Sequence, residues 1–108
     1  MTTSRVPEQR VLYVVEMTVG FTSLAQAREQ APQELAEHLR RSTQLHERGE
    51  VLLAGAFLAP EPGDEHLHTM AICTSQDAAD RFVAGDPFVR SGHVTGHRIR
   101  PWANMFAR

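Results

Sequence analysis

The segment GDPFVRSGH, residues 85–93, holds the residues of this chain that are best placed to do chemistry. Asp86 can accept hydrogen bonds at the start of a short helical turn, Pro87 suits the first helical position, and Gly92 suits the end. A carboxylate is also the usual partner of a proton-transferring imidazole, because it fixes the tautomer and stabilises the charged ring. A chemical role for Asp86 therefore requires a histidine elsewhere in the chain.

His38 has the most unusual position of the six histidines. It falls inside the clearest predicted helix, residues 32–49, on or beside the side marked by Leu35 and Leu39. A neutral imidazole in that position costs free energy unless it has a hydrogen-bond partner. Two interpretations stay open for His38: a core histidine with satisfied hydrogen bonds, and a general acid or base.

The other histidines favour structural roles. His66 and His68 alternate on a predicted strand and point to one face, a spacing that can bind a metal ion. No third and fourth ligand follow them, so two polar residues at a strand entrance are the better interpretation. His46 suits the last turn of its helix, where positive charge is favourable. We expect no metal ion, nucleotide, flavin or other cofactor.

Composition narrows the class of protein. The 108 residues suffice for one domain, and a net charge of −2 argues against a nucleic-acid partner. All 11 basic residues are arginine, which excludes a Schiff-base lysine. No stretch approaches the length of a membrane span, of about 20 apolar residues, and the N-terminus lacks the apolar segment of a signal peptide. We expect a cytoplasmic protein without membrane contact, with a flexible lead-in at residues 1–10 and one domain at residues 11–108.

The hydrophobic pattern predicts the element order β-α-β-β-α-β. The predicted strands are residues 11–17, 51–59, 66–74 and 93–102, and the predicted helices are residues 32–49 and 76–84, with a long connector at 18–32 of possible helical content. This order is typical of an α+β, ferredoxin-like fold, in which one antiparallel sheet carries both helices on one face. No chain is left to cover the other face, so we expect a homodimer.

The chain resembles the YciI-like (YCII-related) family. The resemblance rests on VLYVVEM at 11–17, on the spacing of His38 and HERG at 46–49, and on the Asp-Pro-aromatic turn at 86–88. It implies a dimeric α+β barrel-like assembly of ferredoxin-like subunits. It also places the family's His–Asp pair on His38 and Asp86. One activity known in the family is the cofactor-free dehydrohalogenation of a hydroxylated aromatic ring.

The residues and the resemblance together predict a cofactor-independent acid–base enzyme, a lyase or an isomerase, for a small cyclic or aromatic molecule. In this prediction His38 moves the proton, and Asp86 orients and polarises its ring. Arg90 lies one helical turn from Asp86 and is a candidate for binding an anionic group of the substrate. Phe88 and His93 are the other candidates for substrate binding.

Two alternatives stay open. One is a non-catalytic dimeric binding or accessory module, in which Asp86 only caps a helix and His38 is a satisfied core residue. The other is a cofactor-free monooxygenase of the dimeric α+β barrel type. A hydrogen bond between His38 and Asp86 that opens to a pocket favours the enzyme over the binding module.

Overall fold

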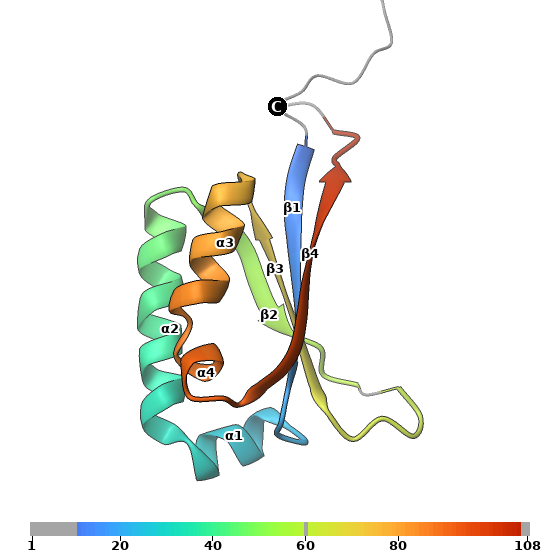
Figure 1. Ribbon diagram of the computed structural model, residues 1–108. Coiled ribbons are helices and arrows are strands. Elements are labelled where there is room, and N and C mark those ends of the chain that lie inside the picture. The colour runs from blue at the N-terminus through green and yellow to red at the C-terminus, as the bar shows by residue number, and fades with distance from the viewer. Residues whose placement is uncertain (1–10, 60, 107–108) are drawn as a thin grey trace, which may run out of the picture.

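The computed structural model describes residues 11–59 and 61–106, so the prediction for residues 1–10 lies outside the described part (Figure 1). The elements are β1 (Val11–Val19), α1 (Leu24–Gln30), α2 (Pro32–Glu47), β2 (Val51–Ala56), β3 (Leu67–Cys73), α3 (Gln76–Gly85), α4 (Pro87–Arg90) and β4 (Val94–Ala103). The predicted order is confirmed. The short helix α4 lies where a helical turn after Asp86 was predicted, and α1 lies in the connector of possible helical content. The second strand is shorter than predicted, because the residues after Ala56 enter the loop to β3.

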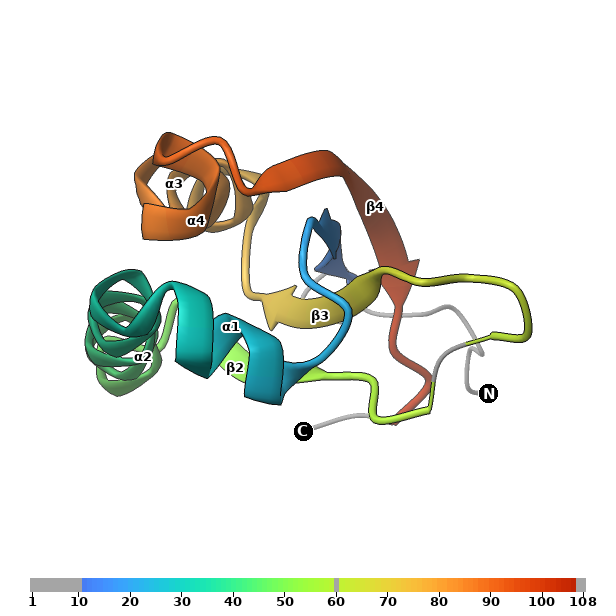
Figure 2. The same cartoon turned by 90° about the horizontal axis from the view of Figure 1, so that it is seen from below.

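The four strands form one antiparallel sheet in the order β2-β3-β1-β4. All the helices lie on one side of it (Figures 1 and 2). This is the predicted ferredoxin-like arrangement, and its two central strands are β1 and β3. None of the helices in the described ranges has both the length and the hydrophobicity of a membrane span.

Local signals place the helices that carry the site. Pro32 occupies the first turn of α2, and Gly49 follows that helix with a φ of 79°. The side chain of Ser75 accepts a hydrogen bond from the backbone N–H of Ala78 at 3.0 Å and so caps the start of α3. The Ser75 cap satisfies an N–H group that has no partner inside the helix, so a local signal determines where α3 begins.

The core lies between the sheet and the helices. Alternate residues of β1 are buried there and pack with side chains of β3 and α3: Val15, Met17, Ala71, Cys73, Ala79 and Phe82. Cys73 is fully buried, and burial raises the pKa of its thiol to about 11. The only cysteine of the chain is therefore a small apolar core residue and remains a protonated thiol at neutral pH.

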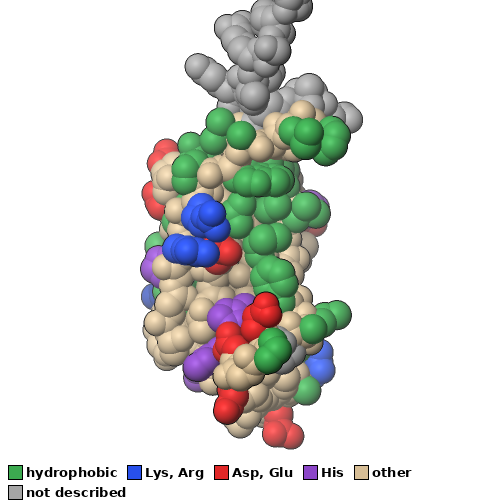
Figure 3. All heavy atoms as spheres, turned by 90° about the vertical axis from the view of Figure 1, so that its right-hand side faces the viewer, with side chains coloured by type: hydrophobic (Ala, Val, Ile, Leu, Met, Phe, Trp, Pro, Cys, Tyr) green, Lys and Arg blue, Asp and Glu red, His purple; other side chains and the backbone are tan. Residues whose placement is uncertain are grey.

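The opposite face of the sheet is not covered by a helix, and many apolar side chains lie on it (Figure 3). Leu53 pairs with Ile72, and Trp102 pairs with Leu12, so these side chains share that face. Leu53 and Trp102 are 66% and 47% exposed. Isolated exposed apolar residues are ordinary, but a group of them on one face is typical of an interaction surface.

Candidate active site

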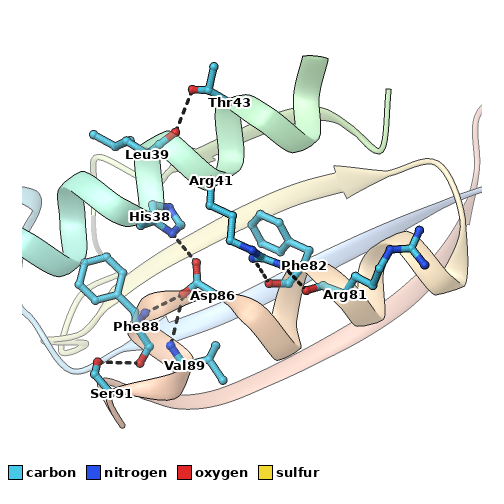
Figure 4. Close-up of polar contacts among 10 residues, drawn as sticks. All are labelled: His38, Leu39, Arg41, Thr43, Arg81, Phe82, Asp86, Phe88, Val89 and Ser91. Carbon is cyan, nitrogen blue, oxygen red and sulfur yellow. Dashed lines mark hydrogen bonds and ion pairs between the residues drawn. The ribbon is translucent and has the colours of Figure 1, made fainter. Parts of the chain in front are cut away.

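His38 and Asp86 contact each other directly. Nδ1 of His38 donates a hydrogen bond to Oδ1 of Asp86, from the middle of α2 to the junction of α3 and α4 (Figure 4). An ionised carboxylate can only accept, so the proton of this bond is on Nδ1. Among the described residues, Nε2 of His38 has no hydrogen-bond partner. The hydrogen bond at Nδ1 therefore orients the imidazole, and Nε2 is available to exchange a proton with a bound molecule.

The turn between α3 and α4 explains why Asp86 is held so firmly. Asp86 has an extended backbone, with φ −66° and ψ 130°, and it caps α4. Its Oδ2 accepts hydrogen bonds from the backbone N–H groups of Phe88 at 3.0 Å and Val89 at 3.3 Å. The residue is only 1% exposed. Asp86 is thus a helix cap and a histidine partner at once, with one oxygen committed to each role.

The surroundings of the imidazole are apolar. The ring centroid of Phe88 lies 5.4 Å from that of His38, and the ring of Phe82 lies 6.5 Å away in an edge-on arrangement. The side chain of His38 is 24% exposed, whereas that of Asp86 is 2% exposed. Charges that form in such surroundings are poorly screened by water.

The pair lines a cleft of about 570 Å³ between α2 and the β2–β3 edge of the sheet. Most of its walls are apolar, as is usual for small-molecule sites. The polar residues that line it are His38, Ser42, Thr43, His46, Thr69 and Asp86. The cleft has the size and the lining of a site for a small, mostly apolar molecule.

A polar row along α2 that includes Ser42 was not predicted from the sequence, although its two histidines were noted. His38, Ser42 and His46 all line the cleft, and their spacing of four residues puts them on one face of the helix. That spacing is visible in the sequence and is the signal that was available. His46 also donates from Nδ1 to the carbonyl oxygen of Val51 at 2.8 Å, which joins the end of α2 to the start of β2.

The structure separates the other predicted substrate-binding residues. Phe88 lines the cleft, but Arg90 and His93 do not. Arg90 ends α4, and His93 packs its ring on Phe21 with the centroids 4.8 Å apart. The cleft therefore brings together His38, Asp86 and Phe88. A role for Arg90 and His93 in substrate binding stays a prediction.

A second hollow, of about 1010 Å³, lies beside the β2–β3 loop and contains a second His–carboxylate pair. Nε2 of His68 donates to Oδ2 of Asp64 at 2.6 Å, and the hydroxyl of Thr18 lies 3.2 Å from Nδ1 of His68. The backbone N–H of His66 and the side chain of His68 lower the pKa of Asp64. Although this hollow is larger, the side chain of Asp64 is 30% exposed and that of Asp86 only 2%, so the cleft beside Asp86 is the better candidate active site.

His66 and His68 lie at the entrance of a strand and both contact Asp64, as the preferred interpretation expected, but the predicted strand begins one residue too early. β3 begins at Leu67, and His66 belongs to the loop before it, where its backbone N–H donates to Asp64 at 2.9 Å. The reason is that Asp64 binds both residues and so shapes the end of the loop. Within the described residues, no group of three or more His, Cys, Asp or Glu side chains could hold a metal ion.

The chain thus folds as a small ferredoxin-like α+β protein, with a buried His–Asp pair at the wall of an apolar cleft. The chain matches the YCII-related domain over residues 11–103 and belongs to that family. No curated protein sequence matches it.

Two solved structures are similar to the chain. One is 5-chloro-2-hydroxyhydroquinone dehydrochlorinase (TftG) from Burkholderia phenoliruptrix, in complex with 2,5-dihydroxybenzoquinone. It is 19% identical with a TM-score of 0.60, over 84% of this chain and 92% of that chain. The other is SnoaB, a cofactor-independent oxygenase from Streptomyces nogalater, which is 20% identical with a TM-score of 0.41, over 91% and 92%. The first similarity supports the fold, and the second is too distant to argue from.

Proposed function

We propose that this protein is a cofactor-independent acid–base enzyme that eliminates a leaving group from, or isomerises, a small cyclic or aromatic molecule. The observation that carries the proposal is the hydrogen bond from His38 to the buried Asp86 at the wall of an apolar cleft. A carboxylate that orients an imidazole from one nitrogen, with the other nitrogen free, is the arrangement of a general acid or base.

The roles of the two residues differ. Nε2 of His38 takes a proton from carbon or from a hydroxyl group of the substrate, while Nδ1 keeps its proton and its bond to Asp86. The negative charge of Asp86 stabilises the imidazolium that forms. Asp86 does not take the proton from substrate itself, because both of its oxygens accept hydrogen bonds and it is buried.

The reaction balances without a cofactor. In an elimination, His38 removes a proton, the electrons of the broken bond form a double bond, and the leaving group departs with its bonding pair. In an isomerisation, the imidazolium returns the same proton to another atom. The elimination is the first reaction to assay, because the structurally similar dehydrochlorinase is named for the loss of chloride.

The proposal is tested with a panel of halogenated hydroxybenzenes and hydroxyquinones, with halide release and ultraviolet absorbance as readouts. We expect turnover with at least one compound in the wild type and a loss of about 10²-fold or more in His38→Gln. Halide release that His38→Gln leaves unchanged contradicts the proposed role of His38.

An NMR titration tests the pair without a substrate. We expect the midpoint of the His38 titration to fall in Asp86→Asn, because the carboxylate that stabilises the imidazolium is gone while the cap is retained. An unchanged midpoint favours the binding-module alternative, in which Asp86 only caps α4.

We further infer that two copies pack through the uncovered face of the sheet, and that the protein acts in the cytoplasm.

A further inference from the structure

Arg41 joins α2 to the end of α3 (Figure 4). It follows His38 by three residues, so the two side chains are neighbours on one side of the helix. Its Nη1 donates to the carbonyl oxygen of Phe82 at 3.0 Å, and its Nη2 donates to that of Arg81 at 2.5 Å. Phe82 is among the last four residues of α3, whose carbonyls have no partner inside the helix, and positive charge is favourable there. The guanidinium of Arg41 therefore caps α3 from the neighbouring helix.

Gly85 provides the space for this guanidinium. A Cβ atom placed on Gly85 lies 2.5 Å from Nη2 and 2.7 Å from Cζ of Arg41, far closer than van der Waals contact. Among the described residues, the glycines with positive φ are Gly49, Gly63 and Gly92. The backbone of Gly85 consequently does not require glycine, and the missing side chain is what lets Arg41 lie flat against the chain.

The contact of Arg41 lies directly before Asp86 in the chain. α3 ends at Gly85, and Asp86 starts the turn into α4, so the place where α3 ends fixes the place of the carboxylate. Burial lowers the pKa of the Arg41 guanidinium, and the negative charge of Asp86 acts in the opposite direction. An arginine with so high an ordinary pKa stays charged, so its hydrogen bonds to α3 are charge-assisted.

From this geometry we infer that Arg41, lying against Gly85, is a positioning residue that holds Asp86 within hydrogen-bond reach of His38. The inference rests on the proposed function of that pair. His38 and Arg41 belong to one rigid helix, and Asp86 follows the helix end that Arg41 binds. A change in Arg41 or Gly85 therefore moves the carboxylate of Asp86 relative to the imidazole of His38.

The test uses two substitutions that keep the charge of residue 41. Arg41→Lys keeps the cation but loses the planar fork that donates two hydrogen bonds. Gly85→Ala displaces the guanidinium and leaves its chemistry intact, and it is compatible with folding because only the tip of a flexible side chain has to move. The matched controls are Arg40→Lys, at an exposed neighbour, and Gly96→Ala, where a Cβ meets no atom within 4 Å.

The readout is the midpoint of the His38 NMR titration in the intact protein. We expect Arg41→Lys and Gly85→Ala each to lower it by at least half of the shift that Asp86→Asn produces, and the controls to leave it in place. The double variant of Arg41 and Gly85 should shift it little further than either single variant, because both act through one contact.

Three results overturn the inference and separate it from the proposed function. If Asp86→Asn shifts the midpoint and neither variant does, Arg41 is only a structural cap, and the His–Asp pair stands. If Asp86→Asn leaves the midpoint unchanged, the pair itself is not coupled, and both proposals fail. If Arg41→Lys shifts the midpoint in the Asp86→Asn background as strongly as in the wild type, Arg41 acts on His38 without Asp86.

Discussion

On each side of the sheet a histidine contacts an aspartate, and the two pairs differ in what surrounds them. His38 and Asp86 lie on the helical face, where the Asp86 side chain is 2% exposed and the cleft walls are mostly apolar. His68 and Asp64 lie at the loop beside the other face, where the side chains are 35% and 30% exposed. Charges in water interact weakly, whereas buried charges interact strongly.

Both pairs also have backbone partners, but these partners do different things. The N–H groups of Phe88 and Val89 bind Asp86 at the start of a helix, between two packed elements. The N–H of His66 binds Asp64 and closes a turn of the β2–β3 loop. The comparison teaches that a His–carboxylate pair is not itself a sign of chemistry. Burial, a free imidazole nitrogen and an apolar cleft distinguish the pair on the helical face.

The largest expected effect is a loss of turnover that distinguishes the His38–Asp86 pair from the His68–Asp64 pair. His38→Gln should lower turnover by about 10²-fold or more, because it removes the proposed general acid or base. The same change in the other pair, His68→Gln, should leave turnover near that of the wild type. Initial rates of halide release measure both. Adding Asp86→Asn to His38→Gln should reduce the rate little further, because the two residues act as a unit in the proposed mechanism. Equal losses in the His38 and His68 variants contradict the distinction.

The next effect concerns the apolar residues of the uncovered face. Trp102→Glu should weaken a homodimer by about 30-fold or more, the scale of an aromatic residue that anchors an interface. Ala36→Glu, at an exposed position of α2, is the control on the helical face. Light scattering at micromolar concentration measures the mass of each variant. A monomeric wild type rules out the dimer under these conditions.

A smaller effect separates the cap from the charge at Asp86. Asp86→Ala should lower the free energy of unfolding by about 1 kcal/mol, because α4 loses its cap. Asp86→Asn should have little effect on stability, because asparagine caps a helix as well as aspartate does. Urea denaturation with equal m-values measures the difference. If the asparagine variant loses as much stability as the alanine variant, the charge of Asp86 and not its cap stabilises the fold.

The smallest effect belongs to the exposed pair and depends on pH. The pKa of Asp64 is lowered in the folded state, chiefly by the backbone N–H of His66 and then by His68. Its carboxylate therefore stabilises the fold above the unfolded-state pKa of about 4, and this contribution disappears as the pH falls through the folded-state pKa. Asp64→Asn should shift the urea midpoint slightly at neutral pH, and the shift should fade below about pH 4 and in high salt. A shift that is independent of both contradicts the electrostatic explanation.

Local patterns in the sequence predicted most of the fold. Alternating and helical hydrophobic periods identified four strands and the two main helices, and these periods were sufficient to predict the ferredoxin-like order. The same local reasoning predicted Asp86 as the cap of a short turn, with Pro87 inside it and Gly92 after it, and the structure shows this turn. Capping depends on hydrogen bonds between residues two or three apart, so it can be read from a short segment.

Register and strand ends were harder to predict. His66 was expected on a strand, but its hydrogen bond to Asp64 belongs to the loop. The sequence does not show where a strand stops, because pairing with a neighbouring strand decides it. The position of Arg90 outside the cleft was likewise not predicted, because it depends on how α4 packs against the rest of the protein.

The sequence by itself determined the elements, the caps and the placement of His38 at the edge of a buried helix face. Spacing alone did not pair His38 with Asp86; a resemblance to a family suggested that pair, and the tertiary structure brings the two side chains together across 48 residues. Only the tertiary structure decided the walls of the cleft and the contact of Arg41 with Gly85. Both depend on how α2 packs against α3 and the sheet. Such packing is set by the summed fit of many distant side chains, which no short segment of the sequence encodes.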